Sequence, residues 1–333
     1  MPLVAHNNLP TFERLRREGC SIIELEESKK RQVPKLKIGL LNLMPDAALQ
    51  ATERQFMRLL GAATGSVDIY VYVFSVAAMP RIGRALEHVN DYYEDFESVK
   101  HNGLDALVLT GANPAQAQLS SEPFWDGMVE VIEWGRNNVC STLCSCLATH
   151  AVVKQYHQVD RRLLPQKRWG VYSHRVSQHD HFMTYDITKR FDAPHSHVYE
   201  VTELQLQSVG LTVLAVSEEA GVHLAVSADQ LQFVYFQGHP EYDYNSLFKE
   251  FKREVSRFAS GEREDYPPFP ENYFNPEAIE ILTDYRKALY AASDRVKMLD
   301  TFPERLLEPM LDNTWTDTGK AMFNNWLTKV LQV

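Results

Sequence analysis

Short apolar runs alternate with amphipathic stretches along this chain of 333 residues, and this alternation limits the possible folds more than any other feature. Apolar runs predict strands at 37–43, 67–74, 104–109, 139–145, 211–216, 221–226 and 231–236. Helical spacing of apolar residues predicts helices at 52–60, 86–99, 124–136, 147–155 and 244–260. Strands that alternate with helices form βαβ units. We therefore predict an α/β fold with a mostly parallel central sheet flanked by helices.

Changes in composition along the chain suggest three segments. Residues 1–35 are predicted to be a polar, partly helical leader, and residues 36–264 an α/β catalytic domain. Residues 265–333 begin with a loop rich in Pro, Tyr and Phe and then become helical, which predicts a helical C-terminal extension packed on the catalytic domain. Residues 165–201, which are rich in His, Arg and aromatic side chains, are predicted to be irregular.

The bulk composition excludes several classes of protein. Subtracting 44 acidic from 34 basic residues gives a net charge of −10, which argues against a general nucleic-acid binder. No apolar run reaches the length of a membrane helix, and the N-terminus lacks the pattern of a signal peptide. The four cysteines show no zinc-ligand spacing and are expected to be reduced thiols. Together these features predict a cytoplasmic protein without a membrane partner.

Cys146 stands where a predicted strand runs directly into a predicted helix. A nucleophile at such a junction is exposed on a sharp turn. The N-terminus of the helix lowers the pKa of a thiol, and its free N–H groups can stabilise an oxyanion. The alternative is a buried cysteine that only fills space in the core.

His239 and Glu241 follow another predicted strand, at the edge where open α/β sheets place their sites. Pro240 stiffens the link between them, and residues two apart in extended chain point to the same side. Glu241 can therefore orient the His239 imidazole, which would act as the base for Cys146. A solvated histidine and carboxylate in a turn would be the alternative.

Cys146 with the run Gly238-His239-Pro240-Glu241 resembles the class I glutamine amidotransferases, although Ser145 and Leu147 replace the glycines beside their nucleophile. A closer resemblance covers most of the chain. It is to the homoserine O-acyltransferases of the homoserine O-succinyltransferase type. The segments that carry it are 41–45, 110–112, 141–148, 169–171, 194–196, 217–222, 238–243 and 323–327.

This resemblance implies an acyl-enzyme mechanism. Cys146 would take an acyl group from acyl-CoA, and His239 would then activate the hydroxyl of L-homoserine in a step of methionine biosynthesis. The resemblance also implies that Lys167, Ser196 and Arg253 bind substrate. No cofactor and no metal are expected, because succinyl-CoA serves as a co-substrate, and a homodimer is implied.

The resemblance places Ala115 at the position that selects the acyl donor. Acetyl-type members carry a glutamate there, which fills the pocket and repels the distal carboxylate of a succinyl group. A small, neutral alanine leaves space, so we predict succinyl-CoA as the donor. Acetyl-CoA remains the alternative donor.

Three other functions are compatible with parts of the sequence. The first is a glutamine amidotransferase-like hydrolase that uses the same three residues. The second is a zinc-binding module in which the pairs His195/His197 and His179/His181 supply ligands, since paired histidines suit zinc. The third is a non-catalytic descendant of the enzyme, against which the presence of Cys146 with both partners argues.

Overall fold

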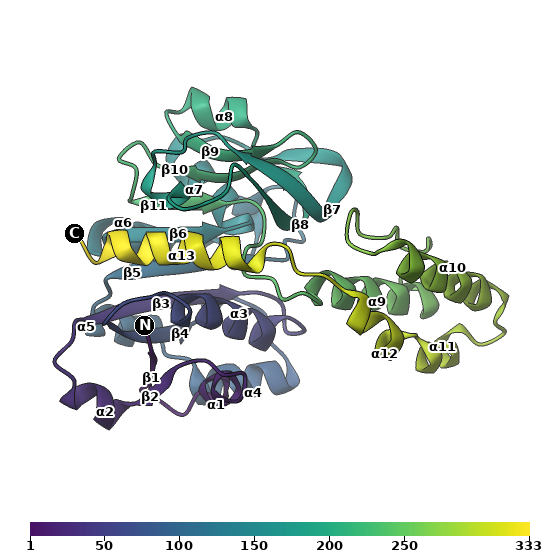
Figure 1. Ribbon diagram of the computed structural model, residues 1–333, viewed down its shortest axis with the longest axis horizontal. Helices are drawn as coiled ribbons and strands as arrows, with labels where there is room; N and C mark the ends of the chain where they lie inside the picture. Colours follow the sequence, from purple (N-terminus) through teal and green to yellow (C-terminus); the bar gives the residue numbers. More distant parts are fainter.

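The computed structural model describes residues 1–333 and is built around one eleven-stranded sheet of order β2-β1-β4-β3-β5-β6-β11-β10-β9-β7-β8. The strands are β1 (Leu3–Ala5), β2 (Ile22–Glu24), β3 (Lys35–Leu43), β4 (Asp68–Phe74), β5 (Ala106–Ala112), β6 (Ser141–Ser145), β7 (Arg162–Val176), β8 (Arg190–Glu200), β9 (Thr212–Ser217), β10 (Gly221–Val226) and β11 (Phe233–Phe236). The helices are α1 (Pro10–Arg17), α2 (Leu25–Lys30), α3 (Leu49–Gly61), α4 (Gly83–Tyr92), α5 (Phe96–Asn102), α6 (Trp125–Asn138), α7 (Leu147–His157), α8 (Glu203–Ser208), α9 (Ser246–Ala259), α10 (Pro276–Ala291), α11 (Arg295–Met298), α12 (Glu304–Leu307) and α13 (Thr316–Val330). The predicted α/β class, with a mostly parallel sheet flanked by helices, is confirmed (Figure 1).

The strands from β2 to β11 in this order are parallel to one another. Helices α3 and α13 cover one face of this part of the sheet, and α6 and α7 cover the other. Because both faces are buried, the central strands β3 and β5 are almost continuously apolar. Strands β6 and β11 are neighbours, so their carboxyl ends lie side by side at the same edge of the sheet.

The strands beyond β11 pair in an antiparallel manner, and β7 and β8 form a long hairpin at the edge. This hairpin covers most of residues 165–201, which the sequence predicted to be less regular. That prediction was wrong for the two strands, whereas the connection at 177–189 lacks strand structure. The last part of β7, from Tyr172 to Val176, alternates between buried and exposed side chains. Its polar residues therefore belong to a strand with one solvated face and do not signal a loop.

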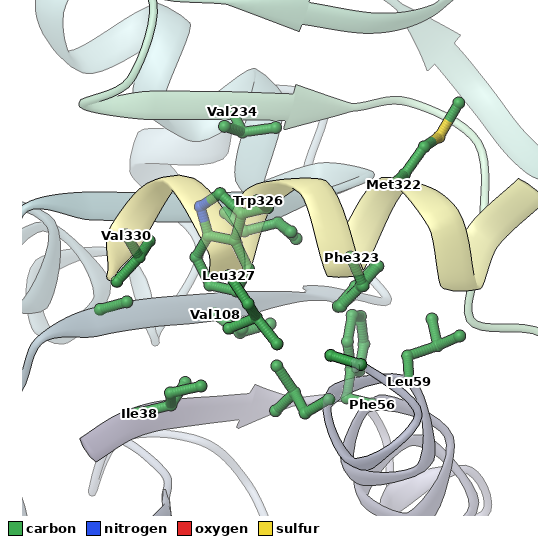
Figure 2. Packing of buried hydrophobic residues seen from close by; sticks show 14 of the residues in the cluster. Ile38, Phe56, Leu59, Val108, Val234, Met322, Phe323, Trp326, Leu327 and Val330 are labelled. Carbon is green, nitrogen blue, oxygen red and sulfur yellow. The ribbon is translucent and has the colours of Figure 1, made fainter. Parts of the chain in front are cut away.

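Helix α13 returns from the end of the chain to cover the sheet (Figure 1). Figure 2 shows the apolar side chains of α13 among those of the sheet and α3. Phe323 and Trp326 are fully buried in one cluster with Ile38 of β3 and Phe56 of α3. The indole Nε1 of Trp326 donates a hydrogen bond to Ser141 Oγ at 2.8 Å, at the start of β6. Both the apolar burial and this bond fix α13 on the sheet.

The predicted segments 1–35, 36–264 and 265–333 do not each form a separate part of the structure. Strands β1 and β2 of the first segment extend the edge of the sheet. Helices α10, α11 and α12 pack with α9 around a separate apolar cluster, which forms a lobe beside the sheet (Figure 1). The last segment is thus shared between this lobe and the α/β layers. The helices are all too short or too polar to cross a membrane.

Candidate active site

Cys146 is the single residue between β6 and α7, and its backbone is strained. It has φ 51° and ψ −108°, a left-handed conformation that residues with a side chain rarely adopt. Such strain costs on the order of 1–3 kcal/mol and is kept where a side chain must be presented at a tight turn. The sharp strand-to-helix turn that the sequence predicted is therefore present at Cys146.

Strand β11 holds this turn in place through one backbone carbonyl. The Phe236 carbonyl accepts hydrogen bonds from the Cys146 N–H at 2.7 Å and from the Thr149 hydroxyl at 2.9 Å. The same hydroxyl lies 3.1 Å from the carbonyl of Cys144. Because β11 leads directly to His239, these bonds fix the cysteine turn relative to the histidine.

His239 and Glu241 form the expected pair beyond β11. The Nδ1 atom of His239 lies 2.7 Å from Oε1 of Glu241, and both side chains are buried. The His239 N–H donates to the Pro194 carbonyl at 2.8 Å, and the imidazole stacks on Tyr242 with the ring centres 4.3 Å apart. Backbone, carboxylate and aromatic ring together hold the imidazole in one orientation.

Electrostatics favour the protonated form of His239. Burial alone would lower the pKa of its imidazole, but the negative charges of Glu241 and of the Cys146 thiolate outweigh burial and raise the pKa well above its usual value. Cys146 and His239 line the same cavity, so the thiol, the imidazole and the carboxylate can act as one chemical unit.

The cavity in front of Cys146 has a volume of about 410 Å³. Its walls come from the loops after β3 and β5, from β8 and from α9. The predicted substrate-binding residues Lys167, Ser196 and Arg253 all line it. Ala115 is exposed on the loop after β5 and does not line the cavity, although its neighbour Pro114 does.

A carboxylate that the sequence did not single out, Glu250 of α9, lies in this wall. It accepts hydrogen bonds from Ser196 Oγ at 2.7 Å, from Trp169 Nε1 at 3.0 Å and from the Tyr242 hydroxyl at 2.7 Å. Lys167 Nζ lies 3.4 Å away. Burial would raise the pKa of Glu250, but Lys167 and these hydrogen bonds lower it, so the group stays ionised. Glu250 therefore fixes the two predicted binding residues Ser196 and Lys167.

Three further cavity residues, Arg161, His150 and Tyr199, were also missed by the sequence interpretation. One of them had a usable signal. His150 stands four residues after Cys146, which is the spacing of neighbours on one helix face, whereas Tyr199 lies three residues after Ser196 on a strand and shares no face pattern with it. Arg161 lies at the end of the loop after α7 and carried no such signal.

Behind the site, a chain of buried histidines runs from the cavity wall into the core. The Nδ1 atom of His174 lies 2.8 Å from the Tyr172 carbonyl and must donate to it. His174 Nε2 is therefore an acceptor for His195 Nε2 at 3.0 Å, and His195 Nδ1 in turn accepts from His197 Nε2 at 2.9 Å. With all three imidazoles neutral, each bond is donated in the same direction, from His197 through His195 and His174 to the Tyr172 carbonyl.

His223 completes this group but has no hydrogen-bond partner at either ring nitrogen, although it is only 1% exposed. The ligand nitrogens of His174, His195 and His223 lie within 4.8 Å of one another. The histidine pairs considered for zinc are divided by the fold, because His179 is exposed and does not join this group. A side chain on Gly238 would meet His195 and His223 nitrogens at 2.6 Å, so the group packs directly behind the turn that carries His239.

The buried histidines predict an acid-sensitive fold. Burial lowers the pKa of His150 and His174 from 6.5 to about 4 and that of His197 to about 3. Between pH 6.5 and about 4 the unfolded chain therefore binds protons that the folded chain does not, and stability should fall as pH falls through this window. Each such histidine contributes up to about 1.4 kcal/mol per pH unit. His223→Leu should make this slope shallower and raise the free energy of unfolding at pH 7 by about 1 kcal/mol, because no hydrogen bond is lost.

Urea unfolding from pH 5 to pH 8 measures both effects. The exposed His179→Gln variant is the matched control and should leave the pH slope unchanged. A loss of stability in His223→Leu would contradict the prediction and would mean that the His223 nitrogens have a partner, such as a bound cation or water.

The sequence matches the family described as homoserine O-succinyltransferase over residues 2–333. The chain is 50% identical to the homoserine O-succinyltransferase of Methylobacter tundripaludum and 51% identical to that of Methylococcus capsulatus, in each case over 100% of this chain and 94% of the relative. A glutamine amidotransferase structure from Methylobacillus flagellatus matches 89% of this chain and 95% of its own, with 12% identity and a TM-score of 0.47. Similarity that low supports no inference about activity. The full-length matches, together with the cysteine turn and its histidine and glutamate, show that this chain belongs to the homoserine O-succinyltransferase family.

Proposed function

We propose that this protein transfers a succinyl group from succinyl-CoA to the hydroxyl of L-homoserine through an acyl-enzyme on Cys146. The observation that carries the proposal is the strained Cys146 turn, which shares a cavity with the buried His239–Glu241 pair. Membership of the family supplies the names of the substrates.

In the first step the Cys146 thiolate attacks the thioester carbonyl of succinyl-CoA. The electropositive N-terminus of α7, which begins directly after Cys146, would stabilise the developing oxyanion through its N–H groups. The bond between the carbonyl carbon and the CoA sulfur breaks, and the leaving thiolate takes the proton from the His239 imidazolium. The products of this step are CoA and succinyl-Cys146, and His239 is left neutral.

In the second step neutral His239 removes the proton from the homoserine hydroxyl as its oxygen attacks succinyl-Cys146. The bond between the carbonyl carbon and Cys146 Sγ breaks, which gives O-succinyl-L-homoserine and restores the thiolate beside the imidazolium. Glu241 stabilises the positive charge on His239 and holds its Nδ1 proton, so that Nε2 is the atom that exchanges protons.

The cavity offers charges that suit these substrates. Lys167 and Arg253 supply positive charge for substrate carboxylates, and the Ser196 hydroxyl is held toward Glu250. Lys167 also lies over the Trp169 ring at 4.4 Å, which limits its freedom.

Mass spectrometry after mixing the protein with succinyl-CoA alone tests the proposal. Without homoserine the acyl-enzyme should accumulate, with one succinyl adduct on the tryptic peptide 137–154. That peptide also holds Cys140 and Cys144, so fragment ions must assign the adduct to Cys146. Burial raises the pKa of the Cys140 thiol to about 11 and that of Cys144 further, so neither should react. An adduct that persists in Cys146→Ala, or no adduct with an active enzyme, would refute the acyl-enzyme.

Ala115 is proposed to favour the succinyl donor, and Ala115→Glu is expected to reverse this preference. A carboxylate at this loop position would repel the distal carboxylate of succinyl-CoA, lowering its kcat/KM by about 100-fold while acetyl-CoA is spared. The measurement is kcat/KM with each donor at saturating homoserine, and Gln118→Glu on the same exposed loop is the control. Unchanged succinyl preference in Ala115→Glu would remove Ala115 from the account of specificity.

A further inference from the structure

Arg161 places a positive charge in the catalytic cavity without a carboxylate partner. Its Nη2 donates hydrogen bonds to the carbonyls of Gln116 at 2.9 Å and Ala117 at 3.2 Å, and its guanidinium lies 3.8 Å from the centre of the Tyr199 ring. Its Nε atom is buried and has no partner. The nearby carboxylate of Glu122 instead accepts the backbone N–H of Gln116.

Two other cations of the cavity are already close to acidic groups. Lys167 lies 3.4 Å from Glu250, and Arg253 lies 3.8 Å from Glu254. Lys249 forms no ion pair, as is also true of Arg161, but among these cavity cations only Arg161 has a buried N–H group without a partner. Arg161 is therefore the cavity cation that gains most from an incoming anion.

Burial lowers the pKa of Arg161, and its neighbours Tyr199, Glu122 and Cys146 offset only part of this effect. A half-buried guanidinium without a counterion is costly, because desolvation is not repaid by an ion pair. An anion bound against the free edge of Arg161 would recover that energy in a charge-assisted hydrogen bond. Arg161 and Cys146 line the same cavity, so an anion bound to Arg161 within it would lie near the nucleophile.

The position of Arg161 indicates which anionic group of succinyl-CoA it can reach. Succinyl-CoA carries its phosphates at the far end of a long pantetheine arm, whereas its acyl carboxylate is separated from the thioester carbonyl by only two methylene groups. A cation in the same cavity as Cys146 is thus placed for the acyl carboxylate, and the phosphates lie beyond it.

We infer that Arg161 is the binding group for the distal carboxylate of the succinyl chain and thereby selects the dicarboxylic acyl donor. This inference rests on the proposed function. It also gives the Ala115 position a physical role, because Arg161 is bonded to the two peptide carbonyls that follow Ala115 by one and two residues. A glutamate at 115 would place a carboxylate on the loop that Arg161 contacts, where it would compete with the succinyl carboxylate for Arg161.

The test compares donors that differ only at the distal group. Butyryl-CoA has the chain length of succinyl-CoA with a methyl group in place of the carboxylate, and acetyl-CoA lacks the chain. We expect Arg161→Met to lower kcat/KM for succinyl-CoA by about 100-fold and to change the value for butyryl-CoA by less than about threefold. Arg161→Lys, which keeps the charge but loses the planar fork, should recover part of the succinyl activity.

Arg162→Met is the matched control, because Arg162 is the next residue, is exposed and pairs with Glu200 outside the cavity. It should leave the ratio of succinyl to butyryl activity unchanged. Lys249→Met tests the competing cation and should not change that ratio either.

Three results would overturn the inference. Equal losses with succinyl-CoA and butyryl-CoA in Arg161→Met would show that Arg161 only supports the loop at 116–117. An unchanged succinyl activity would exclude a contact with the carboxylate, and a selective loss in Lys249→Met would assign the carboxylate to Lys249. Failure of the proposed function is seen separately, as wild-type protein that succinyl-CoA does not acylate at Cys146.

Discussion

Cys146→Ala is expected to reduce the rate of succinyl transfer by about 10⁴-fold or more, because no other group can form the covalent intermediate. The two remaining cysteines of this region cannot replace it. Cys144 is fully buried in β6, and Cys140 precedes the strand at its opposite end. The measurement is homoserine-dependent release of CoA under saturating substrates.

Removal of the partly buried Cys146 thiol should not unfold the protein. Alanine at 146 relieves no backbone strain and buries no polar group, so the melting temperature should stay within a few degrees of wild type. Cys140→Ala is the control for loss of a nearby thiol and should keep full activity. If Cys146→Ala transferred succinyl groups at the wild-type rate, the double displacement would be wrong and direct attack by homoserine would replace it.

Glu241→Gln is expected to lower kcat by about 10³–10⁴-fold and to move its pH dependence. The charge of Glu241 is one of the two that raise the pKa of His239 against burial. In the acyl-enzyme the thiolate charge is gone, so Glu241 alone opposes burial there. Without it the pKa of His239 falls, and the acidic limb of kcat, which reports deprotonation of His239, shifts to lower pH.

The pH profile separates this electrostatic role from a structural one. A glutamine at 241 keeps the shape of the side chain and can still accept the Nδ1 proton at the 2.7 Å contact. A loss of kcat with an unmoved limb would therefore assign Glu241 to packing alone. His239→Gln serves as the reference, because it removes the titrating group and should abolish the limb entirely.

The parallel half of the fold was predictable because its strands are buried on both faces. Strands such as β3 and β4 are buried at nearly every position, and the predicted strand at 67–74 differs from β4 by only one residue. The β7–β8 hairpin escaped prediction because an edge strand alternates apolar and polar residues, and Arg and His in it resemble a loop. The return of α13 to the sheet depends on tertiary packing that no local pattern records.

The residues of the candidate site also divide into those that a local sequence pattern places and those that tertiary packing places. Cys146, His239 and Glu241 stand at the ends of strands, and the order of strands in an open sheet brings such ends together. Glu250 and Arg161 are placed by other means. Glu250 lines the cavity because of the way α9 packs beside it. Arg161 lies in the connection between α7 and β7, and its guanidinium packs on Tyr199 of the β7–β8 hairpin. Sequence spacing alone could not bring either residue to the cysteine.

Helix α13 also bears on how the protein is made. Phe323 and Trp326 close an apolar surface formed by Ile38 and Phe56, which belong to the first fifth of the chain. During synthesis these two residues are made long before α13, so the surface lacks this cover until residues 316–330 have been added. A growing chain in this state is exposed to aggregation, and premature termination just before residue 316 would leave the surface bare. Synthesis of α13 is therefore the step that allows this apolar surface to be buried.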